Sequence, residues 1–512
     1  MHRLCLLSFL LLVLSFTLKA QILPKEQSVL NYRLIGFSFP PNNKILDYTL
    51  EIAKGSYSTE ECFKENIVKT IHSATNKIIG EVPSFGSQYT WRAVYNFGEA
   101  GNKVTAFFHF STGIIPAVDT SITRLKIIQP ALKFTHGYVF LDDNKTLYDM
   151  DGNPVWYLPE IEGRSITPRD LKISPQGTIT LMYDPPYEIN YNGDVLWKAP
   201  TKGIVNGEIS ENYNHEFTKL SNGHYMVLGE DSAVWAHSIY SSKHNSLAGN
   251  NNDVPFRKMQ FGTLIEYDEQ GTVAWSWKSS EYFAQSDLRY FVPQNGSHDI
   301  DVHENSFYFD EKHNNIYISF KNINRIIKVK YPEGTVINTY GVKYKPGASK
   351  TNDDLFCGQH ACKLSENGYL YLFNNNSCDS TGLPKVMLME EPETASEGLK
   401  KIWEYDCTTE GSSEHLNSMH NFIAGGNVEE LPDHSIFVCM SGGYSKLFIV
   451  SPEKEILWSA IPERKSPLEN NWQQVSQYRA SIIKSRKDLE RLIWNAEASP
   501  SITETAHVLT SH

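Results

Sequence analysis

The chain has 512 residues, of which 40% are hydrophobic and 12% aromatic, and it carries 59 acidic against 47 basic residues. This length accommodates two to three domains or one large repeat architecture, and the hydrophobic content excludes intrinsic disorder for most of the chain. The net charge of −12 disfavours a nucleic-acid partner, because no overall basic field would hold a phosphate backbone.

The first twenty residues predict a secretory signal peptide. An early Arg3 precedes an apolar run from Leu4 to Leu18, and Ala20 stands before Gln21. An uncleaved membrane anchor is the alternative, but the run is short for a spanning helix and no later apolar stretch is longer. We therefore expect residues 1–20 to be removed and the mature protein to be periplasmic or secreted, with no membrane partner. Its net charge of −14 means that an anionic substrate needs a local positive cluster.

Six cysteines follow the signal peptide. They are Cys62, Cys357, Cys362, Cys378, Cys407 and Cys439. An exported protein can use them in disulfides, although the sequence does not choose the pairing. Cys357 and Cys362 lie closest together and bracket a histidine, but this spacing fits no common zinc pattern. We therefore expect a disulfide or buried thiols here, and no metal.

Residues 21–118 are predicted to form a small all-β domain. Residues 47–52 and 103–110 alternate between apolar and polar side chains, with the period of two that half-buried strands show. Residues 89–94, a turn at 99–102 and the closing segment 110–113 resemble the last strands of a fibronectin type III-like β-sandwich. This resemblance implies a fold and no chemistry.

A repeat of irregular spacing runs through residues 119–460. One element is a polar turn followed by a strand that ends in tryptophan or another apolar residue. Its six copies lie at residues 151–156, 192–197, 269–275, 332–337, 402–403 and 452–458. The second element is a hairpin with an Asn-Gly turn, as at residues 215–228 and 360–373. The alternation predicts an all-β, six-bladed β-propeller around a central channel; an open series of β-sandwiches is the alternative.

Residues 461–512 are predicted to form a C-terminal helix and tail. The helix is placed over residues 467–494, packed on the outside of the propeller, because apolar residues alternate there with charged ones. The apolar positions are Val475, Tyr478, Ile482, Ile483 and Leu489. A flexible tail is expected from residue 497.

A polar residue opens each predicted inner strand. Counting back a fixed distance from the hairpin turns identifies His136, Arg169, His215, His303, His360 and Asn427. In a propeller these positions face one mouth of the channel, so four imidazoles and a guanidinium would converge there. A single one of these histidines is more plausibly an ordinary core or rim residue. Their common register favours a site.

A ring of this kind suits two sorts of ligand. Protein hydrogen-bond donors can hold an anion such as sulfate or phosphate, and neutral imidazole nitrogens can hold a metal. Arg169 favours the anion, because guanidinium does not ligate metals and matches the geometry of oxyanions. A histidine nitrogen can also attack an activated sulfuryl or phosphoryl centre and hold it covalently.

Segments of the predicted propeller resemble the bacterial arylsulfate sulfotransferase family. The likeness is carried by residues 301–310 with 315–329, by Gln359-His360 with 364–375, and by 426–432, and it spans about Phe134 to Trp458. The N-terminal β-sandwich is also a family feature. The resemblance implies a periplasmic enzyme that moves a sulfuryl group from an aryl sulfate to a phenol. The family route is ping-pong through a sulfohistidine, without a nucleotide sulfate donor or a cofactor.

The family pattern also implies roles for single residues. His303 and His360 stand where the family keeps two histidines that stabilise the transferring sulfuryl oxygens. Lys321 falls where many members have arginine. Two departures stand out: no arginine follows residues 373–376, and Lys446 takes the place of the family's nucleophilic histidine. His420 lies close by in the sequence and could supply a nitrogen instead.

Three hypotheses follow from the sequence. The first is an exported sulfotransferase of aryl sulfates and phenols with no metal or cofactor, in which His420 or His360 attacks the sulfuryl group. Its catalytic residues are His303, His360 and His420, and its substrate-binding residues are His215, Arg169, His136, Lys321, Asn427 and Lys446. The second is a non-catalytic propeller that binds a ligand or glycan and has lost the nucleophile. The third is a metal-dependent hydrolase or lyase.

Overall fold

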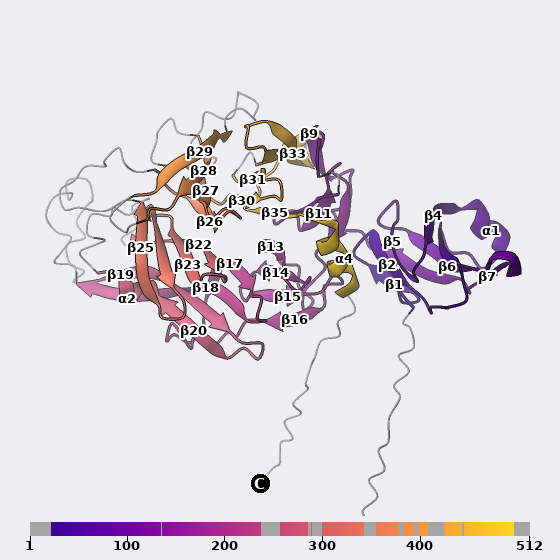
Figure 1. The fold of residues 1–512 in the computed structure, drawn as a ribbon, viewed down its shortest axis with the longest axis horizontal. Helices are drawn as coiled ribbons and strands as arrows, with labels where there is room; N and C mark the ends of the chain where they lie inside the picture. The colour runs from indigo at the N-terminus through magenta and orange to yellow at the C-terminus, as the bar shows by residue number, and fades with distance from the viewer. Residues whose placement is uncertain are drawn as a thin grey trace, which may run out of the picture. The chain divides into compact units, whose positions relative to one another are not determined.

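The fold is described from a computed structural model of the chain. It describes residues 22–134, 136–236, 256–284, 288, 300–341, 355–377, 383–393, 398–407, 424–442 and 445–495. The predicted signal peptide and the tail beyond 495 lie outside these residues. The chain divides into two compact units, one ending at Gly113 and one beginning at Ile114 (Figure 1).

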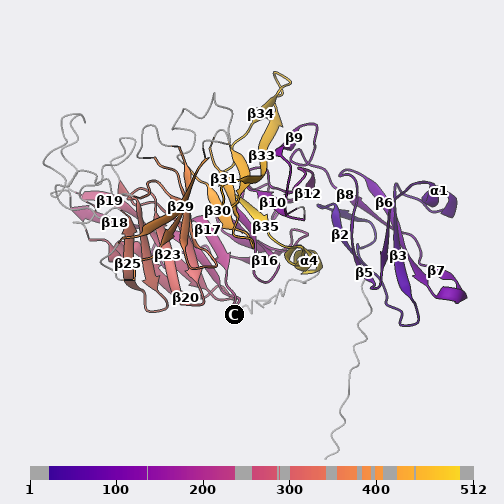
Figure 2. The same ribbon diagram turned by 45° about the horizontal axis from the view of Figure 1, so that its top comes forward.

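The first unit is built from two sheets (Figure 2). The larger sheet has the order β1-β8-β6-β3-β4, with β7 paired to β6, and the smaller sheet pairs β2 with β5. The elements are β1 (Ser28–Leu30), β2 (Leu34–Ser38), β3 (Asp47–Lys54), α1 (Glu60–Glu65), β4 (Ile67–Ser73), β5 (Lys77–Glu81), β6 (Gln88–Asn96), η1 (Gly98–Ala100), β7 (Asn102–Val104) and β8 (Phe108–Thr112). Phe37 of β2 contacts Trp91 of β6 with ring centroids 5.2 Å apart, so the sheets pack against each other. The fibronectin type III-like assignment stays a prediction.

Six mainly antiparallel sheets of four to six strands form the described part of the second unit. Four of them follow the chain in order. They are β13 (Arg169–Ile173), β14 (Ile179–Met182), β15 (Tyr187–Ile189) and β16 (Val195–Lys198); β17 (Tyr213–Lys219), β18 (Tyr225–Ala236), β19 (Phe256–Tyr267) and β20 (Val273–Lys278); β22 (Glu304–Asp310), β23 (Asn315–Phe320), β24 (Arg325–Lys330) and β25 (Thr335–Gly341); and β26 (His360–Leu364), β27 (Leu370–Asn374), β28 (Lys385–Glu390) and β29 (Lys400–Asp406). Helix α2 (Ser279–Tyr282) and the short β21 (Ile300–Asp301) lie beside β19.

The remaining two sheets join the ends of the second unit. One sheet has the order β30-β31-β32-β33-β34 with β9 paired to β33, and the other has the order β12-β11-β10-β35. Their strands are β9 (Thr123–Gln129), β10 (Tyr138–Leu141), β11 (Thr146–Asp149), β12 (Pro154–Tyr157), β30 (Asn427–Glu430), β31 (Ile436–Met440), β32 (Lys446–Val450), β33 (Ile456–Lys465), β34 (Trp472–Gln474) and β35 (Ala480–Ile483). One terminal strand from each of the six sheets contacts those of its neighbours in the order β35-β13-β17-β22-β26-β30, and β30 contacts β35 again, so these inner strands form a closed ring. The second unit is therefore a β-propeller-type fold.

The segment predicted as one long helix is helical only near its end. Only α4 (Arg486–Trp494) is helical in this segment. Residues 480–483 form β35, which pairs antiparallel with β10 and is the innermost strand of the sheet β12-β11-β10-β35, called the first sheet below. All four side chains of β35 are buried, so the strand lacks the alternation that would reveal it. The spacing between Tyr478 and Ile482 instead mimics a helical turn. The sheet ring thus extends beyond residue 460 and is closed by a strand from near the end of the chain.

The repeated tryptophans link neighbouring sheets. Trp156, Trp275 and Trp403 donate their indole N–H to the carbonyl oxygens of Tyr191, Pro332 and Pro452, each at 2.8 Å. Each acceptor lies in the turn before the outermost strand of the next sheet. Trp458 donates to Met150 at 2.9 Å in the same way, which connects the last sheet to the first. Four of the six copies of the sequence repeat therefore supply a tryptophan that donates a hydrogen bond to the next sheet, and each bond is worth about 0.5–1.5 kcal/mol.

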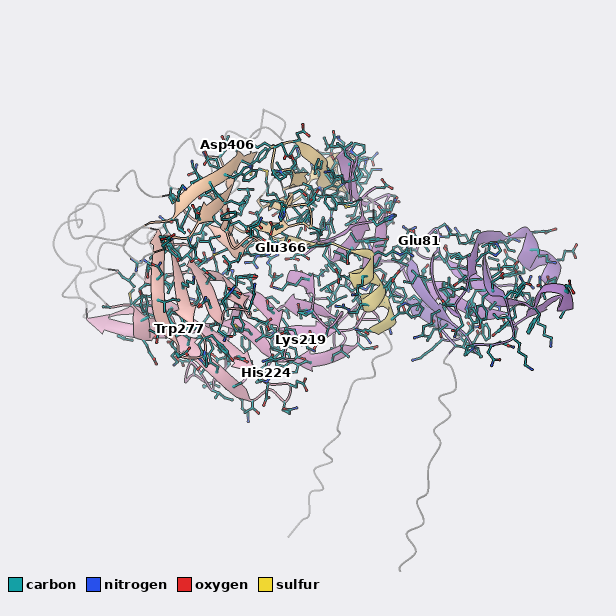
Figure 3. The ribbon with its side chains drawn as sticks, viewed as in Figure 1. Glu81, Lys219, His224, Trp277, Glu366 and Asp406 are labelled. Atoms are coloured by element: carbon teal, nitrogen blue, oxygen red, sulfur yellow. The ribbon has the colours of Figure 1, made fainter. Side chains whose placement is uncertain are left out.

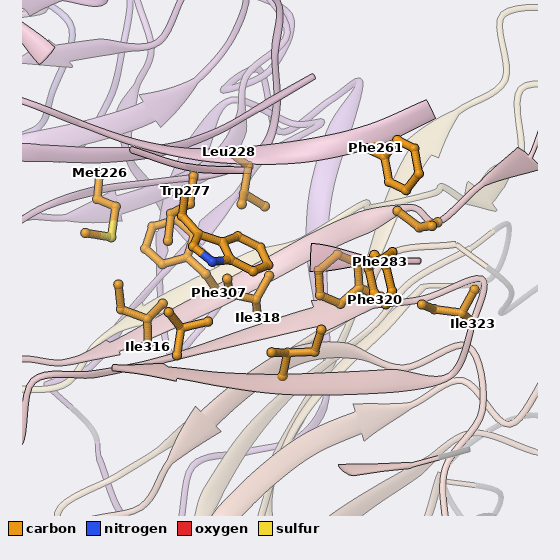
Figure 4. Close-up of a cluster of buried hydrophobic side chains, with 14 of the residues drawn as sticks. Met226, Leu228, Phe261, Trp277, Phe283, Phe307, Ile316, Ile318, Phe320 and Ile323 are labelled. Atoms are coloured by element: carbon orange, nitrogen blue, oxygen red, sulfur yellow. The ribbon is translucent and has the colours of Figure 1, made fainter. Parts of the chain in front are cut away.

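Apolar side chains fill the space between adjacent sheets (Figure 4). Between the sheet of β17–β20 and the sheet of β22–β25, Trp277 packs with Leu228 of β18 and with Phe307 and Ile318 of the following sheet. Polar pairs complete the contacts: Lys219, labelled in Figure 3, reaches the buried Glu188 of the preceding sheet at 3.0 Å. Burial of one large apolar side chain, such as Leu228 or Phe307, contributes about 1.5–3 kcal/mol, so these interfaces hold the inner strands in place.

The cysteines and helices add two observations. Among the described cysteines, Cys62, Cys362 and Cys439 carry free thiols, so Cys362 does not pair with its neighbour Cys357. Cys362 is one of the buried thiols that the sequence allows. Within the described ranges, no helix combines the length and the apolar character that crossing a bilayer requires.

Candidate anion-binding site

Four inner strands begin with the same backbone irregularity. Asp170, His215, His303 and Ala361 have φ values of 51°, 57°, 56° and 52°. In each strand the pairing with the second strand shifts register at this point. Such backbone is costly for residues other than glycine and persists only where surrounding contacts impose it. These bulges redirect the side chains at one end of each inner strand, which is where the functional residues lie.

His215 and His303 form the open part of the site. Their ring centroids are 4.9 Å apart, and Nδ1 of His215 is 2.8 Å from the hydroxyl of Tyr478. Burial, with the nearby His303 and Arg479, holds the pKa of His215 well below its ordinary value. His215 is therefore neutral at pH 7, and one of its nitrogens can accept a hydrogen bond.

Asp301 orients His303. Its carboxylate oxygens lie 2.9 Å from Nδ1 and 2.7 Å from the backbone nitrogen of His303, so Nδ1 carries the proton and donates it. In the part of the chain that the structure covers, Nε2 of His303 makes no hydrogen bond. The side chain is 27% exposed, against 35% for Asp301. His303 thus presents an unoccupied, carboxylate-supported nitrogen to the site.

His360 is held on both sides. The backbone N–H of Gly425 donates to its Nε2 at 3.1 Å, so Nδ1 must carry the proton, and it donates to Oδ1 of Asn375 at 2.7 Å. The ring is buried, and burial with the nearby Lys321 and Arg479 holds its pKa well below the ordinary value. His360 is a neutral, fixed imidazole whose two nitrogens are both engaged.

Arg479 lies beneath these residues and was not predicted. It precedes β35, is 2% exposed, and pairs with the carboxylates of Asp170 at 3.3 Å and Glu216 at 3.6 Å. It also donates to the carbonyl oxygen of Asn305 at 2.8 Å. Its charge contributes to the lowered pKa values of both His215 and His360. Arg479 therefore connects the closing strand to three neighbouring inner strands.

Arg169 and Tyr478 form one side of the same cluster. The guanidinium of Arg169 lies 4.6 Å from the ring centre of Tyr478 and donates to Asp143 at 2.7 Å. Asp143 also accepts from the backbone nitrogen of Tyr478 at 2.6 Å. Since 40% of the Arg169 side chain is exposed, its remaining N–H groups face solvent. It is placed to meet an anion at the edge of the site.

Lys321 adds a positive charge. Its backbone nitrogen donates to the carbonyl oxygen of His303 at 2.9 Å, and its charge helps to lower the pKa values of His215 and His360. Burial lowers the pKa of Lys321 itself, against the opposing effect of Asp301. The ammonium group makes no hydrogen bond or ion pair with any residue that the structure describes. It is free to bind a ligand.

A cavity of about 120 Å³ opens beside the half-buried His215 and His303. Its lining includes His215, His303, Asp301, Glu304 and Gly262. The sequence did not single out Asp301 or Glu304, although both flank the predicted His303. Among the described residues, no three His, Cys, Asp or Glu side chains gather in a way that could hold a metal ion.

Four predicted residues are not part of this cluster as described. His136 is exposed in the turn before β10, which is the second strand of its sheet because β35 occupies the inner place. Asn427 is buried and donates to the carbonyl oxygen of Ala480 at 2.7 Å, so it joins β30 to β35. Lys446 is buried at the start of β32, the third strand of its sheet. His420 lies outside the described residues.

The cluster has a clear chemical character. His215, His303, Lys321, Arg169 and Arg479 bring hydrogen-bond donors and positive charge to one end of the inner strands of an otherwise acidic protein. Burial lowers the pKa values of His215 and His360 most, and the neighbouring positive groups lower them further; a bound oxyanion would offset that second effect. Fold and site together define a β-propeller-type protein with a candidate anion-binding site.

Comparisons with known proteins identify the family. The family model "Arylsulfotransferase (ASST)" matches residues 126–402, more than half of the chain, so the chain belongs to the arylsulfotransferase family. Membership supports aryl sulfotransferase activity in general and implies aryl sulfates and phenols as substrates. No curated protein matches the sequence.

Solved structures match the chain with low sequence identity and low TM-scores. A protein of unknown function from Bacteroides caccae is 12% identical, with a TM-score of 0.38, over 71% of this chain and 100% of its own. A periplasmic gluconolactonase from Pseudomonas aeruginosa is 10% identical, with a TM-score of 0.32, over 85% of this chain and 99% of its own. The fold assignment rests on the sheet topology of the chain itself.

Proposed function

We propose that the protein is an exported enzyme that transfers a sulfuryl group from an aryl sulfate to a phenol through a sulfohistidine, without a nucleotide sulfate donor or a cofactor. The observation that supports this most is the convergence of His215, His303, Lys321 and Arg479 in a chain of net charge −12. The N-terminal signal sequence supports export.

The basic groups supply the binding energy for the sulfate ester. The free ammonium of Lys321 and the exposed edge of Arg169 donate to the sulfuryl oxygens, while His215 lies beside the attacking ring. Each charge-assisted hydrogen bond of this kind is worth about 1.5–3 kcal/mol. Negative charge on these oxygens is stabilised most when the sulfur–oxygen bond breaks, which is the condition for catalysis.

The nucleophile in this proposal is Nε2 of His303. Its lone pair attacks sulfur, the bond from sulfur to the aryl oxygen breaks, and the aryl oxygen leaves with the electron pair. Asp301 keeps the proton on Nδ1 and offsets the positive charge that develops on the ring, as the carboxylate of a catalytic triad does. In the second step a phenol oxygen attacks the sulfohistidine, and Nε2 recovers its lone pair.

His360 positions other groups in this scheme. Both of its nitrogens are occupied, by Gly425 and Asn375, so attack from His360 would first require these hydrogen bonds to break. Its neutral ring keeps β26 and the segment before β30 in register beside His303. His420 remains a competing nucleophile that the experiment below separates from His303.

Mass spectrometry of the mature protein tests the proposal. Incubation with p-nitrophenyl sulfate should release nitrophenol and add about 80 Da to the protein, and a second phenol should then remove that mass as its sulfate ester. His136→Ala, which lies away from the cluster, is the matched control and should behave as the wild type does. Transfer should also survive treatment with a chelator. A folded protein that neither gains mass nor transfers the group contradicts the proposal.

A further inference from the structure

Glu304 is a buried carboxyl group beside the attacking histidine. It is 4% exposed, and neither of its carboxyl oxygens has a hydrogen-bond partner among the described residues. Unpaired buried carboxylates are costly, because desolvation disfavours the charged form. Such a group calls for an explanation in terms of function.

The structure leaves space for this side chain. A β-carbon on Gly262 would lie 2.1 Å from Oε2 of Glu304, so only glycine at this position accommodates the carboxyl group. The nearby hydroxyl of Ser279 is engaged with Gly262, donating to its carbonyl oxygen at 2.8 Å and accepting from its nitrogen at 3.0 Å. The carboxyl group therefore sits against backbone and faces the cavity.

The cavity joins Glu304 to the reacting groups. Besides His215 and His303, its lining includes two other carboxylates, Asp301 and Glu230. Glu230 accepts from Asn214 at 3.2 Å, and Asp301 is engaged with His303. Among the described residues that line the cavity there is no lysine or arginine. Burial raises the pKa of Glu304 to about 8, against a smaller opposing effect of Ser279. Glu304 is consequently protonated at neutral pH and can donate a proton.

We propose that Glu304 is the general acid and general base of the transfer reaction, giving its proton to the departing phenolate and taking one back from the acceptor phenol. This inference rests on the proposed function. In the first step the aryl oxygen leaves sulfur with an electron pair and receives the proton of Glu304, which becomes a carboxylate. In the second step the carboxylate takes the phenol proton as the phenol oxygen attacks sulfur. The protein returns to its starting state, and no further reactant is needed.

Proton donation matters most for basic leaving groups. A simple phenol has a pKa near 10, so its anion leaves poorly without a proton, whereas nitrophenolate is a much weaker base. General acid–base catalysis by a positioned side chain contributes about 10²–10⁴-fold. Removing the proton of Glu304 should therefore slow transfer from phenyl sulfate far more than transfer from p-nitrophenyl sulfate.

The experiment compares Glu304→Gln with the wild type in single-turnover release of phenol from the two donors. The variant should lose about 100-fold or more with phenyl sulfate and less than about 10-fold with p-nitrophenyl sulfate. Glu211→Gln is the matched control, since Glu211 is also a buried carboxyl with a raised pKa but lies outside the cavity lining. It should react with both donors as the wild type does.

The outcomes separate the two proposals. If the wild type transfers sulfuryl groups but Glu304→Gln loses nothing, or loses equally with both donors, this inference is overturned and the proposed function stands. A wild type that transfers from neither donor overturns both. Infrared difference spectra give a reading that needs no turnover: at pH 6.5 the wild type should show the band of a protonated carboxyl group that Glu304→Gln lacks. Absence of that band also overturns the inference.

Discussion

Arg479 is the residue on which the closure of the sheet ring and the charge of the site both depend. Its guanidinium pairs with Asp170 and Glu216 and donates to the carbonyl oxygen of Asn305, while its backbone leads into β35. Arg479→Met keeps much of the side-chain volume and removes the charge. The carboxylates of Asp170 and Glu216 then lose the arginine partner inside the protein.

The expected loss is large because the group is 2% exposed. Breaking one side of a buried ion pair costs about 3–5 kcal/mol, a large part of the 5–15 kcal/mol that stabilises a typical domain. Arg479→Lys keeps the charge and loses the hydrogen bond to Asn305, so we expect a loss of about 1–3 kcal/mol. After Arg479→Met, Lys172 remains as a partner of both carboxylates, at 2.5 Å from Asp170 and 3.6 Å from Glu216. Adding Asp170→Asn should recover part of the loss, because one lysine then faces one carboxylate.

Urea unfolding followed by tryptophan fluorescence measures these differences. Arg486→Met is the matched control, since Arg486 pairs with Glu490 on the surface of α4 and is 70% exposed. Surface pairs of this kind contribute about 0–1 kcal/mol. If Arg479→Met destabilises the protein no more than Arg486→Met does, the buried network does not hold the closing strand, and the reasoning is refuted.

Three further predictions concern the site. Lys321→Met should weaken the binding of inorganic sulfate, measured by calorimetry, about 10-fold or more, because a charge-assisted hydrogen bond is lost, while Lys321→Arg should retain it; unchanged affinity in the methionine variant would contradict this. Asp301→Asn should lower kcat by about 100-fold or more with little change in KM, because the charge that offsets the sulfated ring is gone, and an unchanged kcat would count against the dyad. Glu304, whose pKa is raised to about 8, keeps a proton that the unfolded chain loses above its ordinary pKa of about 4.3, so stability falls as pH rises through this window. His215 and His360, with lowered pKa values in the folded protein, still bind protons in the unfolded chain near pH 6.5, but they do so equally in the wild type and in Glu304→Gln. The wild type should therefore lose about 2 kcal/mol more stability than Glu304→Gln between pH 6.5 and 8, and equal slopes would contradict the assignment.

The β-propeller-type fold was predictable because its repeat has a direct physical cause. Trp156, Trp275, Trp403 and Trp458 recur since each donates to a turn of the next sheet. This repeated hydrogen bond leaves tryptophan at the same place in four of the six sheets. The alternation of turns and strands then follows from the sequence alone.

The closing strand was not predictable from the same pattern. β35 has no hairpin of its own and no alternation, because its side chains are buried on both faces. One signal was present: the first sheet has only three strands between residues 138 and 157, so a fourth had to come from elsewhere. Missing it placed His136 at the centre and overlooked Tyr478 and Arg479, which occupy the position that the first sheet contributes to the site.

The register of the inner strands explains the remaining differences. His215 and His303 occupy the bulged position with positive φ, whereas His360 comes one residue before it. Asn427 follows the corresponding Gly426, whose φ is 108°. A shift of one residue changes which side a strand residue faces, so a fixed count from the turns cannot separate residues that face the ligand from residues that hold the strands together.

Mapping the covalent intermediate tests the central claim most directly. The mature wild type is incubated with p-nitrophenyl sulfate, quenched under basic conditions, digested and sequenced by mass spectrometry. The added mass of about 80 Da should lie on His303, and His303→Ala should form no adduct while keeping its fold. An adduct on His420, His360 or any other residue, or no adduct during active transfer, would contradict the assignment of His303 as the nucleophile.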